Sequence, residues 1–563
     1  MFKSTFFPNL WKLLKPYWLS DEKYLALGLL ILTILCEMTQ IAFAVKLSYW
    51  SKSLYDALQF FDKTALISLL TQFVWILIIL ILVSGYAGYF SSLLFNRYKR
   101  WLVKAYKEKW LLTKAYYLMP VSNQEVDNPD QRISDDLGQL ASLSINLFIG
   151  FLKTLITLIS FSVILWKLSG MLRLPYVNWV IPGYMFWAAL LFSTVGTTIT
   201  FKVFKNLVKL NYMQEKFSAN FRYSLIHIRA SAEQIAFYQG ESQENNFLTY
   251  VFNFIFENSI KIIKITRTYT FFNSTYFNVI NLLGILIALP RFFAEKLAVG
   301  ILIQTVDAFR NVFVSFSFFV SSYPDIANLK AVINRLTEFN EKIAWVTQKK
   351  DKAIQLSVHT PSATKIKDLT LYLPEGQALI TSLNLTINAG EKWLIQGKSG
   401  SGKTTLMRAM AGLWPYGEGE IILSHEQQKR FYPQRPYLPL TTLRNILEYP
   451  GNEQFENEKI KEILALCHLS HLFQKLDEKN IPWVRRLSLG EQQRIVFAQV
   501  LLQKPDWVFF DEITSALDEE LESILYQLLV EKLPHLTLIS IAHRRTLMHF
   551  HENILKLDDY KLG

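Results

Sequence analysis

The segment from Gly397 to Thr404 has the residue types and spacing of a phosphate-binding loop. It runs Gly-Lys-Ser-Gly-Ser-Gly-Lys-Thr and fits the pattern G-x-x-x-x-G-K-[ST] without a mismatch. Apolar residues ending at Ile395 predict a strand before the loop, and Thr405 to Met410 predicts the first turns of a helix after it. Glycines let backbone N–H groups point inward, and the helix N-terminus adds partial positive charge, so phosphate oxygens meet donors there. We therefore expect the loop to bind nucleotide phosphates.

Two side chains of the loop have separate expected tasks. Lys403 can reach the β and γ phosphates of a nucleotide, and Thr404 can offer its hydroxyl to Mg²⁺. The alternative is a glycine-rich turn that matches the pattern by accident, and the further motifs downstream argue against it. The nucleotide-binding residues expected in this segment are Gly397, Lys398, Ser399, Gly400, Ser401, Gly402, Lys403, Thr404 and Thr405.

A pair of acidic residues follows a second predicted strand, Trp507 to Phe510. Asp511 and Glu512 come directly after this apolar run. The C-terminal tip of a parallel strand is where a metal ion and an attacking water are held in nucleotide-hydrolysing sites. We expect Asp511 to hold Mg²⁺ and Glu512 to polarise the water.

Three more motifs complete an ordered set. Gln434 lies between the loop and the acidic pair, the segment Leu487 to Arg494 (Leu-Ser-Leu-Gly-Glu-Gln-Gln-Arg) precedes that pair, and His543 follows a predicted strand ending at Ile541. Loop, glutamine, signature segment, acidic pair and histidine follow one another as in an ATP-binding cassette. Over roughly its last third, the chain resembles the ATP-binding cassette (ABC) superfamily.

The resemblance implies a role for each of these motifs. Gln434 lies where the family's Q-loop glutamine contacts Mg²⁺ and communicates with the membrane domain, and His543 resembles the switch histidine. Ser515 to Asp518 resembles the D-loop. The signature loop closes over the γ-phosphate of ATP held by the opposite subunit. The implied catalytic residues are Glu512, His543, Gln434 and Lys403, the implied signature contacts are Ser488, Gly490 and Glu491, and the implied Mg²⁺ residues are Thr404, Gln434 and Asp511.

The chain departs from the family pattern at two positions. Leu489 occupies the third signature position, where most members have glycine, so hydrolysis is slower or the start of the following helix is tighter. The aromatic residue that stacks on adenine belongs near Asp368 to Pro374, where Leu373 falls in the expected slot with Tyr372 beside it. Tyr372 is therefore the candidate for adenine contact, and an ordinary strand aromatic is the alternative.

Apolar length distinguishes the rest of the chain from a soluble protein. The 563 residues are 51% hydrophobic and 14% aromatic, and a helix needs about 20 mainly apolar residues to cross a bilayer. Long buried helices of a soluble protein are the alternative, but so many in the first 330 residues fit it poorly. The six segments that qualify are about 24–49, 66–95, 141–168, 178–203, 270–290 and 298–322.

Basic residues gather on alternate sides of these spans. They cluster before the first span, after the second and between the fourth and fifth, whereas the intervening loops hold fewer. This bias places both termini and the cassette in the cytoplasm, and it accounts for the net charge of +12 without nucleic acid. The first 20 residues lack the shape of a signal peptide and indicate an interfacial amphipathic helix. Two cysteines, Cys36 and Cys467, cannot form a disulfide framework.

Two polar, helical segments, about 95–140 and 203–268, indicate that spans two to five continue into the cytoplasm, as in exporter-type ABC membrane domains. Asp127 to Arg132 predicts a turn followed by a capped helix with Pro129 in its first turn, and Ala232 to Glu241 predicts a helix stopped by Gly240. Both segments resemble those of peroxisomal fatty-acyl-CoA half-transporters of subfamily D and of bacterial fused permease–ATPases of the SbmA/BacA type. The latter group is associated with uptake of cobalamin, bleomycin and antimicrobial peptides.

Charged residues inside the spans are further functional candidates. Asp307 and Arg310 share a helix face in span six and can neutralise each other, whereas Glu37 in span one has no partner nearby in sequence. Asp307 and Arg310 can contact the transported solute, or they can merely join helices or face a wet cavity. Glu37 can line a polar cavity, titrate during transport, or pack against another helix as a neutral acid.

The sequence thus predicts six transmembrane helices of exporter type fused to an α/β P-loop cassette. The expected domains are a transmembrane domain at 1–345, a linker at 346–364 and a cassette at 365–563. A chain with one loop and one signature implies a homodimer. The expected function is ATP-driven transport across the bacterial inner membrane, with uptake of cobalamin-like compounds or peptides favoured. Transport of fatty acyl-CoA or lipid and an ATP-hydrolysing regulator that transports nothing are the alternatives.

Overall fold

The computed structural model describes residues 6–122, 128–173, 180–350, 354–359, 363–424, 428–451, 453–542 and 544–560. They divide into two compact units. The first comprises Met1–Met119 and Gln124–Ala344, and the second comprises Pro120–Asn123 and Trp345–Gly563. We refer to them as the helical unit and the cassette unit.

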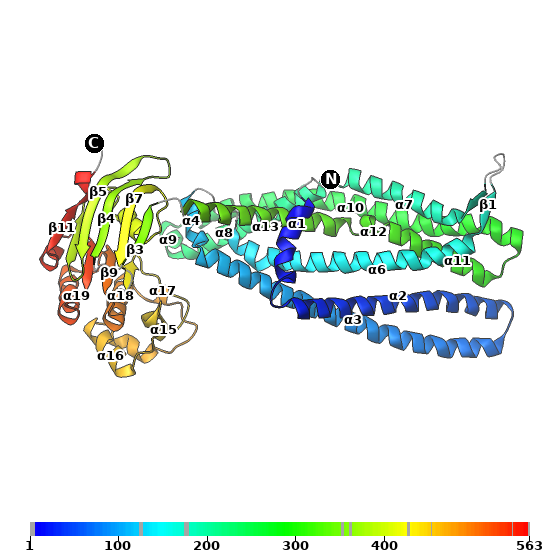
Figure 1. The fold of residues 1–563 in the computed structure, drawn as a ribbon, viewed down its shortest axis with the longest axis horizontal. Helices are drawn as coiled ribbons and strands as arrows, with labels where there is room; N and C mark the ends of the chain where they lie inside the picture. The colour runs from blue at the N-terminus through cyan, green and yellow to red at the C-terminus, as the bar shows by residue number, and fades with distance from the viewer. Residues whose placement is uncertain are drawn as a thin grey trace. The chain divides into compact units, whose positions relative to one another are not determined.

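The helical unit is a bundle of long helices (Figure 1). One short antiparallel pair, β1 (Met171–Arg173) and β2 (Val180–Pro182), joins two of them. The helices are α1 (Phe6–Trp18), α2 (Lys23–Gln59), α3 (Lys63–Leu112), α4 (Ala115–Val121), α5 (Pro129–Gln131), the π-helix η1 (Arg132–Asp136), α6 (Leu137–Ser169), α7 (Tyr184–Val203), α8 (Leu207–Ala230), α9 (Ala232–Tyr238), α10 (Glu241–Glu295), α11 (Val299–Phe316), α12 (Phe318–Ser321) and α13 (Tyr323–Lys350).

Six of these helices are long and apolar enough to cross a membrane, and each overlaps one expected span. They are α2, α3, the continuous helical segment 129–169, α7, α10 and α11. Many of their large apolar side chains are exposed: Trp75 and Ile81 of α3, for example, are 67% and 62% exposed. Outward apolar side chains in such number suit a hydrocarbon solvent rather than water.

Two expected spans differ from the structure at their ends. The fourth begins at Tyr184 rather than near 178, because residues 180–182 pair as β2 with β1. The sixth ends at Phe316, and separate helices follow it. Pro324 is the second residue of α13, where its missing N–H leaves no helical hydrogen bond unmade, so a new helix starts there instead of the old one continuing.

The long helices extend beyond a bilayer, as the polar segments predict. At about 1.5 Å per residue, the 55 residues of α10 measure roughly 80 Å, against a hydrocarbon thickness of about 30 Å. Span four does not continue unbroken, since Phe204 to Asn206 separate α7 from α8. The expected stop at Gly240 lies one residue earlier: Gln239 adopts the left-handed conformation (φ +53°), and the Gly240 N–H donates to the Ile235 carbonyl.

The cassette unit contains two sheets. A five-stranded parallel sheet has the order β11-β6-β10-β9-β8, and a four-stranded sheet has the order β3-β7-β4-β5. The strands are β3 (Gln355–His359), β4 (Ala363–Tyr372), β5 (Ala378–Asn388), β6 (Lys392–Gln396), β7 (Gly417–Ser424), β8 (Lys429–Tyr432), β9 (Trp507–Asp511), β10 (Thr537–Ile541) and β11 (Asn553–Lys556). Strand β3 lies within the segment 346–364 expected to be a linker, and it pairs with β7.

Helices cover the parallel sheet. They are α14 (Lys403–Met410), α15 (Leu443–Glu448), α16 (Asn457–Leu466), α17 (Trp483–Arg486), α18 (Leu489–Gln503) and α19 (Glu519–Lys532), with 3₁₀ turns at Ser470–Lys475, Arg545–Phe550 and Leu557–Tyr560. Every residue of β9 and β10 is buried, which explains why most of their residues are apolar.

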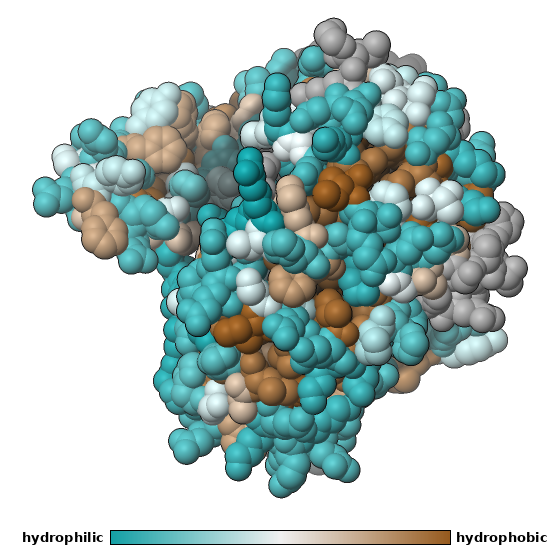
Figure 2. Space-filling model, turned by 90° about the vertical axis from the view of Figure 1, so that its left-hand side faces the viewer, coloured by the Kyte–Doolittle hydropathy of each residue, from teal (hydrophilic) through white to brown (hydrophobic). Residues whose placement is uncertain are grey.

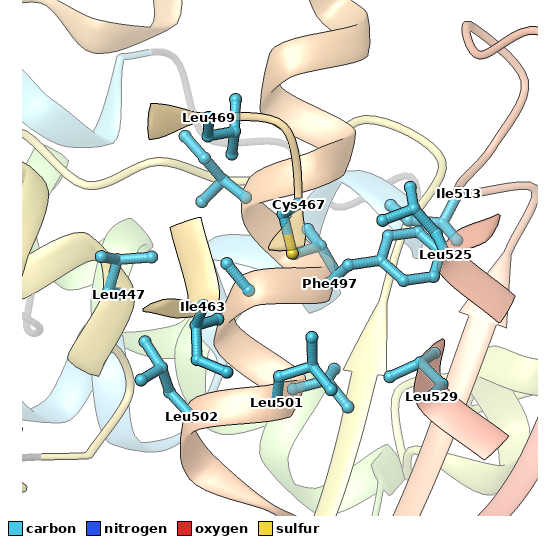
Figure 3. Close-up of a cluster of buried hydrophobic side chains, with 14 of the residues drawn as sticks. Leu447, Ile463, Cys467, Leu469, Phe497, Leu501, Leu502, Ile513, Leu525 and Leu529 are labelled. Atoms are coloured by element: carbon cyan, nitrogen blue, oxygen red, sulfur yellow. The ribbon is translucent and has the colours of Figure 1, made fainter. Parts of the chain in front are cut away.

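A core of aliphatic and aromatic side chains surrounds α18 (Figure 3). Phe497, Leu501 and Leu502 of this helix meet side chains of α15, α16 and α19 there. Cys467 belongs to the same core, and burial raises the pKa of its thiol to about 12. Figure 2 shows the face of the cassette unit turned toward the viewer, where hydrophilic residues prevail and hydrophobic residues form small patches between them.

Candidate nucleotide-binding site

The loop between β6 and α14 has the backbone shape that its glycines predict. Gly400 and Gly402 have φ angles of +76° and +95°, which L side chains rarely adopt. A Cβ on Gly402 would lie 3.3 Å from the Ile380 side chain of β5. The loop therefore needs glycine at this position for conformation and for space, and it delivers the chain into the N-terminus of α14, where an anion is favoured.

Lys403 lies inside this loop. Its Nζ donates to the Gly397 and Lys398 carbonyl oxygens at 2.8 and 3.0 Å, and only 7% of the residue is exposed. These bonds hold the ammonium within the curve of the loop, where it can neutralise phosphate charge. The donor set thus fits a nucleotide triphosphate.

An acidic residue that sequence reasoning missed also contacts the loop. Both carboxylate oxygens of Asp558, in the last 3₁₀ turn, accept from the Lys398 N–H at 3.2 Å. The contact joins residues 160 positions apart, and no local pattern signals it.

The acidic pair stands beside the loop as predicted. The Thr404 hydroxyl donates to Asp511 Oδ1 at 3.3 Å, and the Gln434 side-chain amide donates to Glu512 Oε2 at 3.0 Å. Glu512 has a left-handed φ of +50°, and its N–H donates to the Ile541 carbonyl of β10. The structure therefore brings together Lys403, Thr404, Gln434, Asp511 and Glu512.

The environment of Asp511 disfavours its charge. Burial raises the pKa of this carboxyl group, and the neighbouring Glu512 carboxylate raises it further. The Thr404 hydroxyl and the cations Arg408 and Lys403 oppose this but do not cancel it. A divalent cation at this position would favour the ionised form.

The signature segment forms the N-terminus of α18. Ser488 is the N-cap, its hydroxyl accepts from the Glu491 N–H at 3.2 Å, and Glu491 Oε2 accepts from the Ser488 N–H at 2.9 Å. This reciprocal capping box explains the spacing of the two residues. Burial acts to raise the pKa of Glu491, but hydrogen bonds from Ser488 and His471 outweigh it and lower the pKa.

Leu489 and Gly490 follow the cap. Leu489 is the first residue of α18 and is 39% exposed, whereas a Cβ on Gly490 would lie 3.3 Å from the Ala516 carbonyl. The signature loop thus packs closely on the D-loop. Gln493, one turn further along α18, fastens the two by donating to Ser515 Oγ and accepting from the Ala516 N–H.

Substituting the cap gives a local effect that can be measured. We expect Ser488→Ala to lower the stability of the first turn of α18 by about 1 kcal/mol, which corresponds to about fivefold faster amide exchange there. Hydrogen–deuterium exchange of the peptides covering 488–492 measures this. Ser523→Ala is the control, because that hydroxyl donates only to the Glu519 carbonyl within its own helix. Unchanged exchange in the Ser488 variant would show that the capping box does not hold this turn.

A buried carboxylate in α19 is a second residue that the sequence did not signal. Glu522 is 1% exposed and accepts hydrogen bonds from Thr514, after the acidic pair, and from Thr546. Arg544 Nη1 lies 3.7 Å from Glu522 and donates to the Leu517 carbonyl of the D-loop at 2.8 Å. This network fixes the chain on the C-terminal side of His543, which itself lies outside the described residues.

Tyr372 ends β4 and is half-buried. Its carbonyl accepts from the Trp414 indole, and its N–H donates to the Tyr416 carbonyl. These backbone contacts fix its position in the sheet and leave its contact with adenine a prediction.

Known proteins match both units. Residues 12–293 match the ABC transporter transmembrane region 2 family and residues 380–515 the ABC transporter family. The inner membrane ABC transporter ATP-binding protein YddA of Escherichia coli (strain K12) is 30% identical and covers 94% of each chain. The human lysosomal cobalamin transporter ABCD4 is 26% identical and covers 98% of this chain and 94% of its own.

A solved structure shares the fold. A bacterial Atm1-family ABC exporter with ATP bound superposes with a TM-score of 0.77 at 17% identity, over 96% of this chain and 95% of that one. The chain belongs to the ABC transporter family. It is a fused half-transporter of exporter-type fold, a multi-pass membrane protein whose cassette is an ATPase coupled to transport.

Proposed function

We propose that two copies of this chain form a homodimer that hydrolyses ATP between the phosphate loop of one and the signature loop of the other, and so moves a solute across the bacterial inner membrane. The observation that carries the proposal is that different structural elements hold the phosphate loop and the signature loop. Lys403, Asp511 and Glu512 gather at the tips of the parallel strands, whereas Ser488 is bonded to Glu491 at the start of α18. One chain supplies one of each, so two chains complete two sites.

Each residue of the site has a task in this proposal. Lys403 and the loop N–H groups, from Gly397 to Thr405, hold the phosphates once Asp558 releases the Lys398 N–H, and Tyr372 contacts adenine. Glu512 polarises the attacking water, Gln434 orients the Glu512 carboxylate through their 3.0 Å hydrogen bond, and His543 completes the site. Ser488, Gly490 and Glu491 present the signature loop to the partner's ATP. Binding would close the cassettes and hydrolysis would release them, which drives alternating access in the proposed transmembrane domain, residues 1–345.

Mg²⁺ fits the oxygen donors of Thr404, Asp511 and Gln434, and it would neutralise phosphate charge there. Because the pKa of Asp511 is raised in the folded protein, its negative charge lowers the free energy of unfolding of the nucleotide-free protein. This destabilisation increases as the pH rises through the raised pKa. Asp511→Asn is therefore expected to leave the unfolding midpoint of the ATP-free protein at pH 7 unchanged or slightly raised. The same variant should lose the stabilisation that ATP gives with Mg²⁺.

Thermal unfolding without ATP measures the first effect, and thermal unfolding with ATP, in Mg²⁺ or in EDTA, measures the second. Asp506→Asn is the control, a carboxylate just before β9 that is remote in sequence from the loop and accepts from the Gln428 N–H. Equal Mg²⁺-dependent stabilisation of the Asp511 variant and the wild type would show that Asp511 does not bind the metal ion.

The proposed cargo is a bulky hydrophilic solute, with uptake of cobalamin-like compounds favoured and peptides next. ABCD4, similar over nearly the whole chain, is a cobalamin transporter by name. In this proposal both termini and the cassette lie in the cytoplasm, which the distribution of basic residues supports, and the similarity to the inner membrane protein YddA supports the bacterial inner membrane.

The test is accumulation of labelled cobalamin in cells that lack their own importer, with wild type and Glu512→Gln compared. ATP-dependent accumulation by the wild type alone supports the cargo and the direction. If neither accumulates cobalamin while the purified wild type hydrolyses ATP, the cobalamin assignment fails and peptides are tested next.

Acyl-CoA or lipid is a second candidate, favoured by one feature of the helical unit. A cavity of about 510 Å³ between α7 and α10 is lined by Phe192, Phe271, Phe272, Tyr276, Val279 and Leu283 among others. Its apolar wall fits an acyl chain. Stimulation of ATP hydrolysis by acyl-CoA and not by cobalamin would favour this cargo.

A further inference from the structure

A second cavity lies among the membrane-spanning helices and has a different lining. It measures about 410 Å³, is open on one side and is lined by residues of α2, α3, α6 and α11. Ile41, Ala44 and Leu80 form an apolar part of its wall. Its polar lining consists of Gln40, Lys153, Thr154, Thr157, Asn311 and Ser315.

Lys153 is the charged residue of this lining. Its Nζ lies 2.7 Å from Glu37 Oε2 and donates to Gln40 Oε1 at 3.4 Å. Glu37 is thus partnered across the bundle, by a residue 116 positions away that the sequence did not signal as its counter-ion.

The two charges are not equally accessible. The Lys153 side chain is 45% exposed and the Glu37 side chain 17%. A charge inside a membrane span is costly unless it faces a partner or a wet cavity, and such residues mark solute pathways. Lys153 lines the cavity and Glu37 does not, so the cavity has a cationic side chain in a mixed polar and apolar wall.

Neighbouring groups add acceptors and donors but no second cation to this lining. Asn311 Nδ2 donates to Asp307 Oδ1 at 3.3 Å and to the Asp307 carbonyl, which holds the Asn311 side chain in place. Thr154 and Thr157 supply hydroxyl groups, which can donate to an anion, whereas the Ser315 hydroxyl donates to the Asn311 carbonyl at 2.7 Å.

We propose that this cavity is a subsite for an anionic group, a carboxylate or a phosphate, of the transported solute, with Lys153 as its counter-charge. Glu37 neutralises the ammonium between transport events and is displaced from it when the anion binds. The adjoining apolar wall takes a short apolar part of the same solute. The proposal rests on the transport function proposed above and adds the chemistry of one contact to it.

Charged thiol reagents test the subsite without requiring transport. Thr157→Cys is introduced into the full chain with Cys36→Ser and Cys467→Ala, and the protein is placed in lipid nanodiscs. Modification rates are measured with an anionic and a cationic methanethiosulfonate. Taking the ratio of the two rates removes any effect of Lys153 on the reactivity of the thiol itself.

We expect the anionic reagent to be favoured, and Lys153→Gln to lower the anionic-to-cationic ratio by about tenfold or more, since one charge within a few ångströms acts oppositely on the two reagents. Lys46→Gln is the matched control. It removes the same charge from α2, outside the cavity lining, and should leave the ratio unchanged. A ratio that Lys153→Gln does not alter, or a thiol that neither reagent reaches, would overturn the proposal.

Protection of the thiol from labelling then distinguishes a carboxylate from a phosphate as the anionic group. Hexanoate or hexyl phosphate should slow labelling in the Lys153 protein and not in Lys153→Gln, and the more effective of the two identifies the headgroup. Protection by neither would contradict the proposal. Because labelling needs no ATP, a failure of cobalamin uptake with the ratio intact would count against the cargo and not against the subsite.

Discussion

Glu512→Gln is expected to lower the ATP turnover of the purified protein by about 10²–10⁴-fold, the usual contribution of a general base. Glu512 follows β9 in a left-handed conformation: its carboxylate accepts from the Gln434 side-chain amide, and its backbone N–H donates to the Ile541 carbonyl. Glutamine keeps the size and the hydrogen-bonding capacity of the side chain but cannot accept a proton from water. ATP binding should therefore persist while hydrolysis is lost.

Turnover and ATP binding in nanodiscs measure this pair of effects. Glu520→Gln, an exposed residue in the first turn of α19, makes the same chemical change away from the site and should alter turnover less than twofold. Turnover within tenfold of wild type in Glu512→Gln would show that another group activates the water.

Asp136→Asn is expected to destabilise the helical unit by about 3–5 kcal/mol, because it leaves two buried cations without their counter-charge. Arg335 Nε and Nη2 both donate to the Asp136 carboxylate, at 2.9 and 2.6 Å, and Arg132 Nη1 donates to it at 3.0 Å. All three side chains are at most 4% exposed. The cluster joins the π-helix η1 to α13.

The apparent unfolding midpoint in detergent, at a fixed scan rate, should fall by about 5 °C or more. Asp135→Asn is the neighbouring control: that side chain is 45% exposed, lies 3.7 Å from Arg222 and should contribute about 0–1 kcal/mol. The triple variant Arg132→Met, Asp136→Leu, Arg335→Met removes every charge and should recover much of the loss. Equal midpoints for Asp136→Asn and Asp135→Asn would contradict the role of the cluster.

The cassette was largely predictable because its chemistry is local in sequence. The phosphate loop needs glycines at positive φ, and the signature segment needs a capping box. Each motif lies within eight consecutive residues. Contacts that close the site from far along the chain were not predictable. The hydrogen bonds from the Lys398 N–H to Asp558 and from Thr546 to Glu522 depend on tertiary packing. Their partners have no characteristic spacing in the sequence.

The membrane spans were predictable from apolar length, but their internal polar partners were only partly so. Asp307 and Arg310 are three residues apart and interact electrostatically, as that spacing suggested, but the hydrogen bond that Asn311 donates to Asp307 was not foreseen. Glu37 showed no partner nearby in sequence and finds Lys153 on another helix. Helical spacing identifies neighbours within one helix, whereas the Glu37–Lys153 contact depends on how two helices pack. Pro324 signals the start of α13, but it lies eight residues after Phe316 and does not account for the end of α11.

The central claim, that two chains share each ATP site, is tested most directly with a mixed dimer. One chain carries Lys403→Ala, and the other carries Leu489→Glu, which places a negative charge at an exposed position in the signature loop. Each homodimer should be inactive. In a dimer purified by two different tags, one site contains both defects and the other contains neither, so ATP turnover should return to about half of the wild-type rate. No recovery in the mixed dimer would contradict the shared site.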